Sequence, residues 1–246
     1  MNIWGMTDIG LVRSENQDAY AVRTCEESGF TVCVVCDGMG GPGGGKLASA
    51  LAVDAFLSTC MANLRQGMGV EQVQEVAEFA VAAANTAVYE RAVRDGLRGM
   101  GTTLVSALAW GDQALLSNVG DSRAYVLHPG PGGGIARVTK DHSLVERLVD
   151  KGTITAEEAR SYPGRNLITR ALGPDREALS DNYLIQLHLG DYLLLCTDGL
   201  VSTATDEEME REILRGDDNT CLERLLEIAR DQGAPDNVTA VLLRRQ

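Results

Sequence analysis

Five aspartates stand where short apolar runs begin or end, and this placement suggests a shared metal site. Two of the runs close with the dipeptide Asp-Gly, at Asp37-Gly38 and at Asp198-Gly199. Runs this short and apolar predict strands buried on both faces, where a carboxylate is costly unless a cation compensates it. The glycine after each aspartate permits a sharp turn and leaves the peptide carbonyl open to an ion. A metal ion is the compensator that the sequence favours.

The whole set of aspartates shares this context at predicted strand edges. Its members are Asp18, Asp37, Asp121, Asp198 and Asp236. Any one of them alone is better explained as an ordinary turn aspartate. Five such placements in one chain point instead to a common role, and oxygen ligands without paired His or Cys select hard ions. We therefore expect magnesium or manganese rather than zinc or copper.

Arg13 precedes the first strand that we expect, so its guanidinium could reach these carboxylates. A planar guanidinium fork suits a phosphate group. By itself Arg13 is better interpreted as a surface residue, and its interest comes from the aspartates around it.

Composition limits the possible partners. The chain has 246 residues, with 35 acidic against 22 basic side chains and a formal charge of -13. This balance argues against nucleic acid or an anionic membrane as the main partner, because both reward clustered Lys and Arg. No window suggests a membrane span, and residues 1–10 lack the regions of a signal peptide. We expect a cytoplasmic protein whose six cysteines are reduced, with Cys33 and Cys36 on opposite faces of one strand.

The elements that must position these residues alternate between groups of strands and pairs of helices. We expect strands at 18–23, 30–36, 102–110, 113–118, 124–128, 135–139, 183–187, 192–197 and 238–243, and helices at 46–64, 70–94, 144–151, 155–160, 206–214 and 221–231. Hairpin-like spacing favours stacked antiparallel sheets covered by helices over a doubly wound parallel sheet. We expect one domain over residues 1–246, of class α+β, with a mobile flap at about 142–173.

Eight segments of the chain, in order, resemble the signature blocks of the metal-dependent type 2C protein serine/threonine phosphatases, the PPM family, in their compact bacterial form. The segments are Thr7-Asp8-x-Gly10-x-Val12-Arg13-x-x-Asn16-Gln17-Asp18, Asp37-Gly38-Met39-Gly40-Gly41, Gly101-Thr102-Thr103, Val119-Gly120-Asp121-Ser122-Arg123, Asp141-His142-Ser143, Asn166-x-Ile168-Thr169-Arg170-Ala171-Leu172-Gly173, Thr197-Asp198-Gly199 and Asp236-Asn237-Val238-Thr239. Each block alone is weak, but eight in the right order are specific.

The resemblance implies a four-layer α-β-β-α sandwich of two antiparallel sheets flanked by helix pairs, with a binuclear Mn2+ or Mg2+ centre at one edge. It also implies roles for particular residues. Asp37 would bridge both metals, the Gly38 carbonyl would bind one, and Asp198 and Asp236 would complete the centre. A third, weaker ion would lie between Asp121 and Asp198. Arg13 would hold the substrate phosphate, and Asp18 would orient metal-bound water.

The activity that the resemblance implies is hydrolysis of phosphoserine and phosphothreonine in proteins. A hydroxide bridging the two metals would attack phosphorus, so no protein nucleophile is needed. The partners would be phosphorylated proteins and a cognate serine/threonine kinase that this enzyme opposes, with no nucleic acid and no membrane. We expect a monomer. The physiological substrate and the regulated process do not follow from the sequence.

Two departures from the family pattern bear on this interpretation. Many members outside bacteria have a histidine, thought to protonate the leaving group, where this chain has Met39, and a thioether cannot act as an acid. The family also often continues Gly-Gly-His and Gly-Glu where this chain has Gly41-Pro42 and Gly45-Lys46. Lys46 could change metal affinity or surface recognition, or be a tolerated substitution at a helix start.

Three other interpretations compete with catalysis of this kind. The spacing Gly40-x-x-x-x-Gly45-Lys46 imitates a phosphate-binding loop, but Leu47 stands where that motif needs Ser or Thr. A catalytically weak adaptor of the same fold would bind phosphoproteins without hydrolysing them. It should have lost metal aspartates, and here all five are present. A related phosphatase of anti-anti-sigma proteins is disfavoured by the intact block around Arg13.

Overall fold

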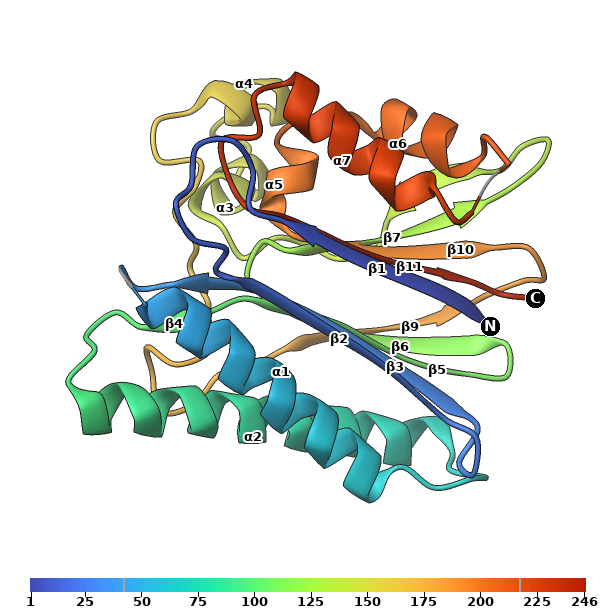
Figure 1. Ribbon diagram of the computed structural model, residues 1–246, viewed down its shortest axis with the longest axis horizontal. Helices are drawn as coiled ribbons and strands as arrows, with labels where there is room; N and C mark the ends of the chain where they lie inside the picture. The colour runs from blue at the N-terminus through green and yellow to red at the C-terminus, as the bar shows by residue number, and fades with distance from the viewer. Residues whose placement is uncertain (42, 217) are drawn as a thin grey trace.

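The computed structural model describes residues 1–41, 43–216 and 218–246, arranged as two stacked sheets with helices on both outer faces (Figure 1). One sheet has the order β1 (Asn2–Asp8), β11 (Val238–Arg244), β10 (Tyr192–Cys196), β7 (Arg123–His128) and β8 (Gly134–Arg137). The other has the order β2 (Asp18–Cys25), β3 (Phe30–Met39), β5 (Leu104–Trp110), β6 (Gln113–Val119) and β9 (Asp181–Gln186), and β4 (Gly101–Thr102) also pairs with β3. Every pairing is antiparallel, which confirms the predicted class.

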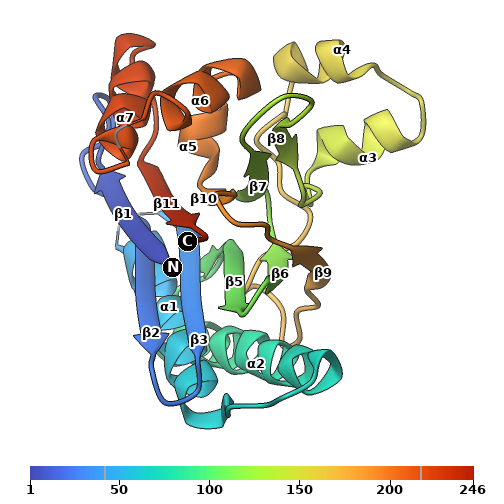
Figure 2. The same ribbon diagram turned by 90° about the vertical axis from the view of Figure 1, so that its right-hand side faces the viewer.

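Helices cover the outer face of each sheet. On the β2-to-β9 sheet lie α1 (Gly44–Asn63) and α2 (Val70–Asp95), and on the other lie α5 (Asp198–Val201), α6 (Asp206–Ile213) and α7 (Cys221–Asp231). Helices α3 (Leu144–Asp150) and α4 (Ala156–Ser161), in the segment that the sequence predicts as a flap, project from the body of the molecule (Figure 2). Pro42, one position of the family departures, lies outside the described residues.

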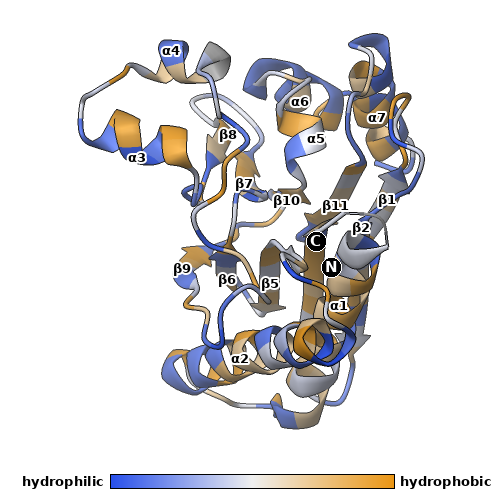
Figure 3. Cartoon of the chain, turned by 90° about the vertical axis from the view of Figure 1, so that its left-hand side faces the viewer, coloured by the Kyte–Doolittle hydropathy of each residue, from blue (hydrophilic) through white to orange (hydrophobic). Residues whose placement is uncertain are grey.

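Strand β3 shows how alternation builds the layers. Val32, Val34 and Cys36 pack into the cluster beneath α1 and α2, whereas Cys33 and Val35 pack between the two sheets. Successive strand residues point to opposite faces, so an unbroken apolar run buries both. Cys33 and Cys36 therefore cannot act together, as we expected, and no disulfide joins any two of the six cysteines. Strands in the middle of the stack, such as β11 and β5, carry hydrophobic colour in Figure 3.

Helix α1 bears on the expectation that no window of the sequence forms a membrane span. Among the described residues it is the single helix long and apolar enough, by length and composition alone, to cross a membrane. One side of the helix, which includes Ala52 and Phe56, is buried in the core cluster with residues of α2 and β3. The apolarity of α1 thus reflects its place as a core helix.

Two elements were missed by the sequence analysis. Strand β1 is an edge strand in which most residues are only half buried, and Gly5 interrupts its apolar pattern because the Tyr20 ring packs where a Cβ would lie. Helix α5 is a single turn that begins at Asp198 itself. The other predicted elements are present, with the predicted strand 102–110 divided into β4 and β5.

Candidate metal centre

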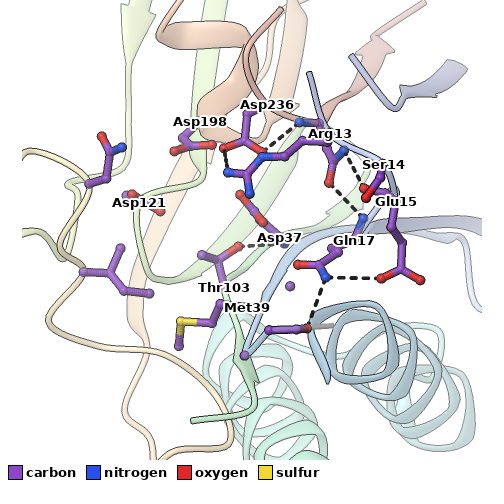
Figure 4. Close-up of a pocket in the computed structure, with 16 residues that line it drawn as sticks. Arg13, Ser14, Glu15, Gln17, Asp37, Met39, Thr103, Asp121, Asp198 and Asp236 are labelled. Atoms are coloured by element: carbon purple, nitrogen blue, oxygen red, sulfur yellow. Dashed lines mark hydrogen bonds and ion pairs between the residues drawn. The ribbon is translucent and has the colours of Figure 1, made fainter. Parts of the chain in front are cut away.

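A cavity of about 520 Å³ opens at one end of the sandwich, where strand ends from both sheets meet. Four of the predicted aspartates line it, namely Asp37, Asp121, Asp198 and Asp236 (Figure 4). Arg13 also lines it and is the only cation among the described residues of the lining. The structure thus brings together side chains that lie up to 223 positions apart in the chain.

Asp37 is held from its backbone near the end of β3. Its N–H donates to Thr103 Oγ1 at 2.9 Å, and its carbonyl accepts from Thr103 N–H and from Thr102 Oγ1, both at 2.8 Å. The next residue must be glycine, because a Cβ on Gly38 would lie 2.0 Å from the Gly45 carbonyl oxygen. These contacts fix the backbone and leave the Asp37 carboxylate directed into the cavity.

The carboxylates repel one another in a setting with little water. Burial raises the pKa of Asp37 well above its usual value, and the charges of Asp18 and Asp198 raise it further. Burial and the nearby Asp198 raise the pKa of Asp121 to about 7. The pKa of Asp198 is also raised, first by burial and then by Asp236. Such a cluster of buried acids is stable in the ionised form only with added positive charge.

Asp236 differs from its neighbours because it already has a cation beside it. Arg13 Nη2 lies 2.7 Å from Asp236 Oδ2, and the Asn237 N–H donates to Asp236 Oδ1 at 2.9 Å. Both carboxylate oxygens are therefore engaged. The guanidinium of Arg13 remains about half exposed at the mouth of the cavity, where it can also meet a ligand.

Asp18 lies behind the cavity rather than on its wall. It stands opposite Asp37 in the register of β2 with β3. Its Oδ2 accepts hydrogen bonds from Thr197 Oγ1 at 2.9 Å and from Thr239 Oγ1 at 2.7 Å. Burial raises the pKa of Asp18 to about 7 despite these two hydrogen bonds. Asp18 thus acts on the cavity in two ways. Its charge raises the pKa of Asp37, and its hydrogen bonds hold Thr197 and Thr239 in place.

The donor atoms fit a hard divalent cation. Asp198 Oδ1 and Asp18 Oδ1 are buried oxygens without a hydrogen-bond partner, and an orphaned carboxylate oxygen at such a place suits an ion. In the described ranges, no three or more His, Cys, Asp or Glu side chains stand close enough together to hold a metal ion as they lie. The aspartates share one cavity without forming a closed ligand shell, and the Arg13 contact accounts for the engaged oxygen of Asp236.

Several residues of the site were given no role from the sequence. Asn237 ties the loop before β11 to the N-terminal segment, since its Nδ2 donates to the carbonyls of Ile9 and Glu15 and its Oδ1 accepts from the Gln17 N–H. Thr103 holds Asp37 and shares a 2.7 Å hydrogen bond with Ser122. Both residues belong to the blocks that carried the resemblance, and that membership was the available signal.

The mouth of the cavity carries polar groups beside the two departures from the family pattern. Met39 lines the cavity. Lys46 lies outside the lining, with its Nζ 3.9 Å from Glu15 Oε1, and it is largely exposed. Gln17 Nε2 lies 3.3 Å from Glu15 Oε2. The Lys46 charge therefore acts at the rim, on Glu15, and does not contact the aspartates.

Comparison with known sequences shows similarity along almost the whole chain. The profile of the family described as "Protein phosphatase 2C" matches residues 12–242. The chain is 34% identical over 244 residues to the serine/threonine phosphatase stp of Listeria monocytogenes, covering 97% of this chain and 94% of that protein. It is 37% identical over 238 residues to the serine/threonine protein phosphatase PstP of Mycobacterium tuberculosis, covering 96% of this chain but only 43% of PstP.

Solved structures give the same result for the fold. The serine/threonine phosphatase of S. agalactiae superposes with a TM-score of 0.91 at 30% identity, covering 100% of this chain and 99% of that one. The catalytic domain of PstP, solved in complex with two manganese ions, superposes with a TM-score of 0.82 at 34% identity, covering 98% and 96% of the two chains.

Proposed function

The chain belongs to the protein phosphatase 2C family, and from this premise we infer that it is a metal-dependent phosphatase of phosphoserine and phosphothreonine in proteins. The observation that carries the proposal is one cavity in which four partly buried aspartates lie together and Arg13 is the single cation among the described lining residues. Carboxylates collect divalent ions, and an arginine at the mouth receives a phosphate. Catalysis is favoured over the adaptor alternative because all five aspartates and Arg13 are retained.

We propose the following metal ligands. Asp37, the Gly38 carbonyl, Asp198 and Asp236 hold two ions, and Asp121 with Asp198 holds a third, weaker one. When bound, the two ions supply an activated water and withdraw charge from the phosphoryl oxygens. Manganese or magnesium suits these oxygen donors, and the complex of the PstP catalytic domain with two manganese ions supports manganese.

The chain's own residues bind and orient the substrate. Arg13 offers the phosphate a guanidinium fork at the mouth of the cavity, and this contact strengthens as negative charge develops on the phosphoryl oxygens. Asp18, held behind the cavity by hydrogen bonds from Thr197 and Thr239, helps orient the attacking water. Met39 lines the same cavity but has no proton to give, so the leaving group must take its proton from water.

Substrate class, partners and location form part of the proposal. Phosphorylated proteins are the substrates, and a serine/threonine kinase is the natural counterpart. We propose one phosphatase domain over residues 1–246, with the flap at 142–173, acting as a cytoplasmic monomer. The absence of disulfides among the six cysteines and the acidic net charge support this location.

The decisive experiment measures phosphate release from a phosphothreonine peptide and from p-nitrophenyl phosphate. Wild type and Asp198→Ala are compared with manganese, with magnesium and with chelator, and circular dichroism confirms folding. We expect manganese-dependent release by the wild type and none by the variant. A wild type that binds the peptide but is inactive with every metal would instead establish the adaptor. Metal-dependent turnover of nucleotides alone would favour the phosphate-loop alternative, although β3 has antiparallel neighbours.

A further inference from the structure

His142 makes contacts that the proposed reaction does not use. Its side chain is buried at the start of the flap, beside the turn that carries Asp121. The Gly120 N–H donates to His142 Nδ1 at 3.1 Å, and the His142 N–H donates back to the Gly120 carbonyl at 2.8 Å. Gly120 has a φ of 110°, and a Cβ there would lie 2.6 Å from Thr103. His142 thus hydrogen-bonds to both backbone groups of Gly120, in a turn that requires glycine one residue before Asp121.

The Nε2 atom and the carbonyl of His142 contact β9 and the C-terminal end of the flap. His142 Nε2 lies 3.1 Å from Asp181 Oδ2 in β9, and Arg170 Nη1 donates to Asp181 Oδ1 at 2.7 Å. Because Nδ1 accepts a hydrogen bond from an amide, the ring proton sits on Nε2, which donates to Asp181. The His142 carbonyl also accepts from the Thr169 N–H at 2.7 Å. The N–H and Nδ1 of His142 thus both bind Gly120, whereas its carbonyl binds Thr169. Its Nε2 lies beside Asp181 and also 3.2 Å from Arg170 Nη1.

These contacts stand next to residues that line the cavity. The flap is closed at its base by the pairing of Ser143 with Ile168 and by a 2.8 Å hydrogen bond from Leu144 N–H to the Leu167 carbonyl. Asn166 and Ile168 reach the cavity from this return segment, and Asp121 reaches it from the Gly120 turn. Among the described residues, the hydrogen bonds of His142 to Gly120 and to Thr169 connect the two.

We propose that His142 is a positioning residue of this phosphatase: it ties the Asp121 turn to flap residues 166–170, so that Asp121 and Ile168 face one cavity at a fixed spacing. The inference rests on the proposed function, because the cavity must be the substrate site for the spacing to matter. A rigid imidazole is suited to this task because it presents an acceptor and a donor on opposite edges. Neither asparagine nor glutamine spans both partners.

Two substitutions separate the two halves of the connection. His142→Asn places an oxygen near the Nδ1 position, which keeps the Gly120 contact and loses Asp181. We expect KM for a phosphothreonine peptide to rise about tenfold with KM for p-nitrophenyl phosphate within about twofold, because only the peptide reaches the flap. Hydrogen exchange over residues 166–170 should become faster.

His142→Gln reaches the Nε2 position, which keeps the Asp181 contact and loses Gly120. We expect flap exchange close to wild type and weaker binding of manganese to the metal-free protein at the site of Asp121, measured by titration calorimetry. The matched control is His128→Gln, because His128 forms a similar pair with Asp191, at 2.8 Å, at the opposite end of β7. The control should change neither KM nor manganese binding.

Other outcomes would overturn the proposal. If both His142 variants lowered kcat equally with unchanged KM and exchange, or if they matched His128→Gln, His142 would be a structural residue only. Should both fail to fold, Asp181→Ala removes the same contact from a 41% exposed position and must reproduce the effects expected of His142→Asn. A wild type without phosphatase activity would reject the proposed function, while hydrogen exchange in the variants would still decide whether His142 holds the flap.

Discussion

Buried carboxylates stand at both ends of β7, β10 and β11, and the two ends treat them differently. At the end away from the cavity, Asp191 binds His128 and the His188 N–H, and Asp218 accepts from Tyr192 and Arg244. At the cavity end, burial and mutual repulsion raise the pKa values of Asp37, Asp121 and Asp198, and Asp198 Oδ1 has no hydrogen-bond partner. The lesson is that pairing, rather than burial, separates structural acids from acids awaiting a cation.

The largest expected effect comes from removing the charge of Asp37 at the cavity end. Asp37→Asn should lower kcat/KM by about a thousandfold or more, since losing metal charge stabilisation costs several kcal/mol. The metal-free variant should be at least as stable as wild type, because one repulsive charge is gone. Phosphopeptide kinetics and urea unfolding measure the two effects.

The matched variant at the far end should lose stability and keep its activity. Asp191→Asn leaves a buried network short of one charged acceptor and should cost about 1–3 kcal/mol of unfolding free energy with nearly unchanged kcat/KM. If both variants destabilised the metal-free protein equally, the contrast between the two ends would fail.

The pH dependence of stability should follow the raised pKa values. Asp18 and Asp121 have folded pKa values of about 7 against an ordinary 3.8. The folded state therefore binds more protons than the unfolded one between pH 4 and 7, and metal-free stability should fall by roughly a few kcal/mol as pH rises through that window. Urea unfolding at several pH values in chelator tests this, and stability rising with pH would contradict it.

Manganese should reverse that trend. Ion binding to carboxylates releases protons, so stabilisation by manganese should grow with pH. At a free concentration of one hundred times Kd, the gain should be about 2.7 kcal/mol per site. Thermal unfolding of the wild type and of Asp198→Ala provides the comparison, and an equal shift in both would place the ion elsewhere.

The smallest expected effect concerns the one paired aspartate of the cavity. Arg13 occupies Asp236 Oδ2, so Arg13→Gln should tighten manganese binding by about two- to fivefold, the value of an exposed ion pair, while weakening phosphate binding. Lys46→Gln removes the same charge at the rim without touching an aspartate. Equal tightening in both variants, measured by calorimetry, would show a general charge effect instead of release of Asp236.

Much of the fold followed from local patterns, because the strands are short apolar runs and α1 and α2 are long. Strand β1 was not predicted because an edge strand is only half buried and Gly5 breaks its apolar pattern. Helix α5 was not predicted because one turn has too few residues to show a helical period.

The sequence predicted that Arg13 and the aspartates would lie near one another, but it did not predict their contacts. The blocks named the aspartates and Arg13, yet nothing local shows that Arg13 pairs with Asp236, 223 positions away, or that Asp18 stands behind the cavity wall. The connection through His142 was hidden for the same reason. Its partners Gly120 and Asp181 are 22 and 39 positions away, so the residue showed no local partner in the sequence.

The hydrogen bonds to Asp18 have a mechanical consequence. Asp37 comes from one sheet, whereas Asp198 and Asp236 adjoin strands of the other, so any sliding between the sheets would pull the site apart. The layer between the sheets is apolar, and apolar contacts resist separation much more than sideways slip. Asp18 in β2 binds Thr197 and Thr239 of the opposite sheet by directional bonds. Asp18 therefore resists sliding of one sheet over the other, and it does so close to the cavity, where a shift between the sheets would move the aspartates apart.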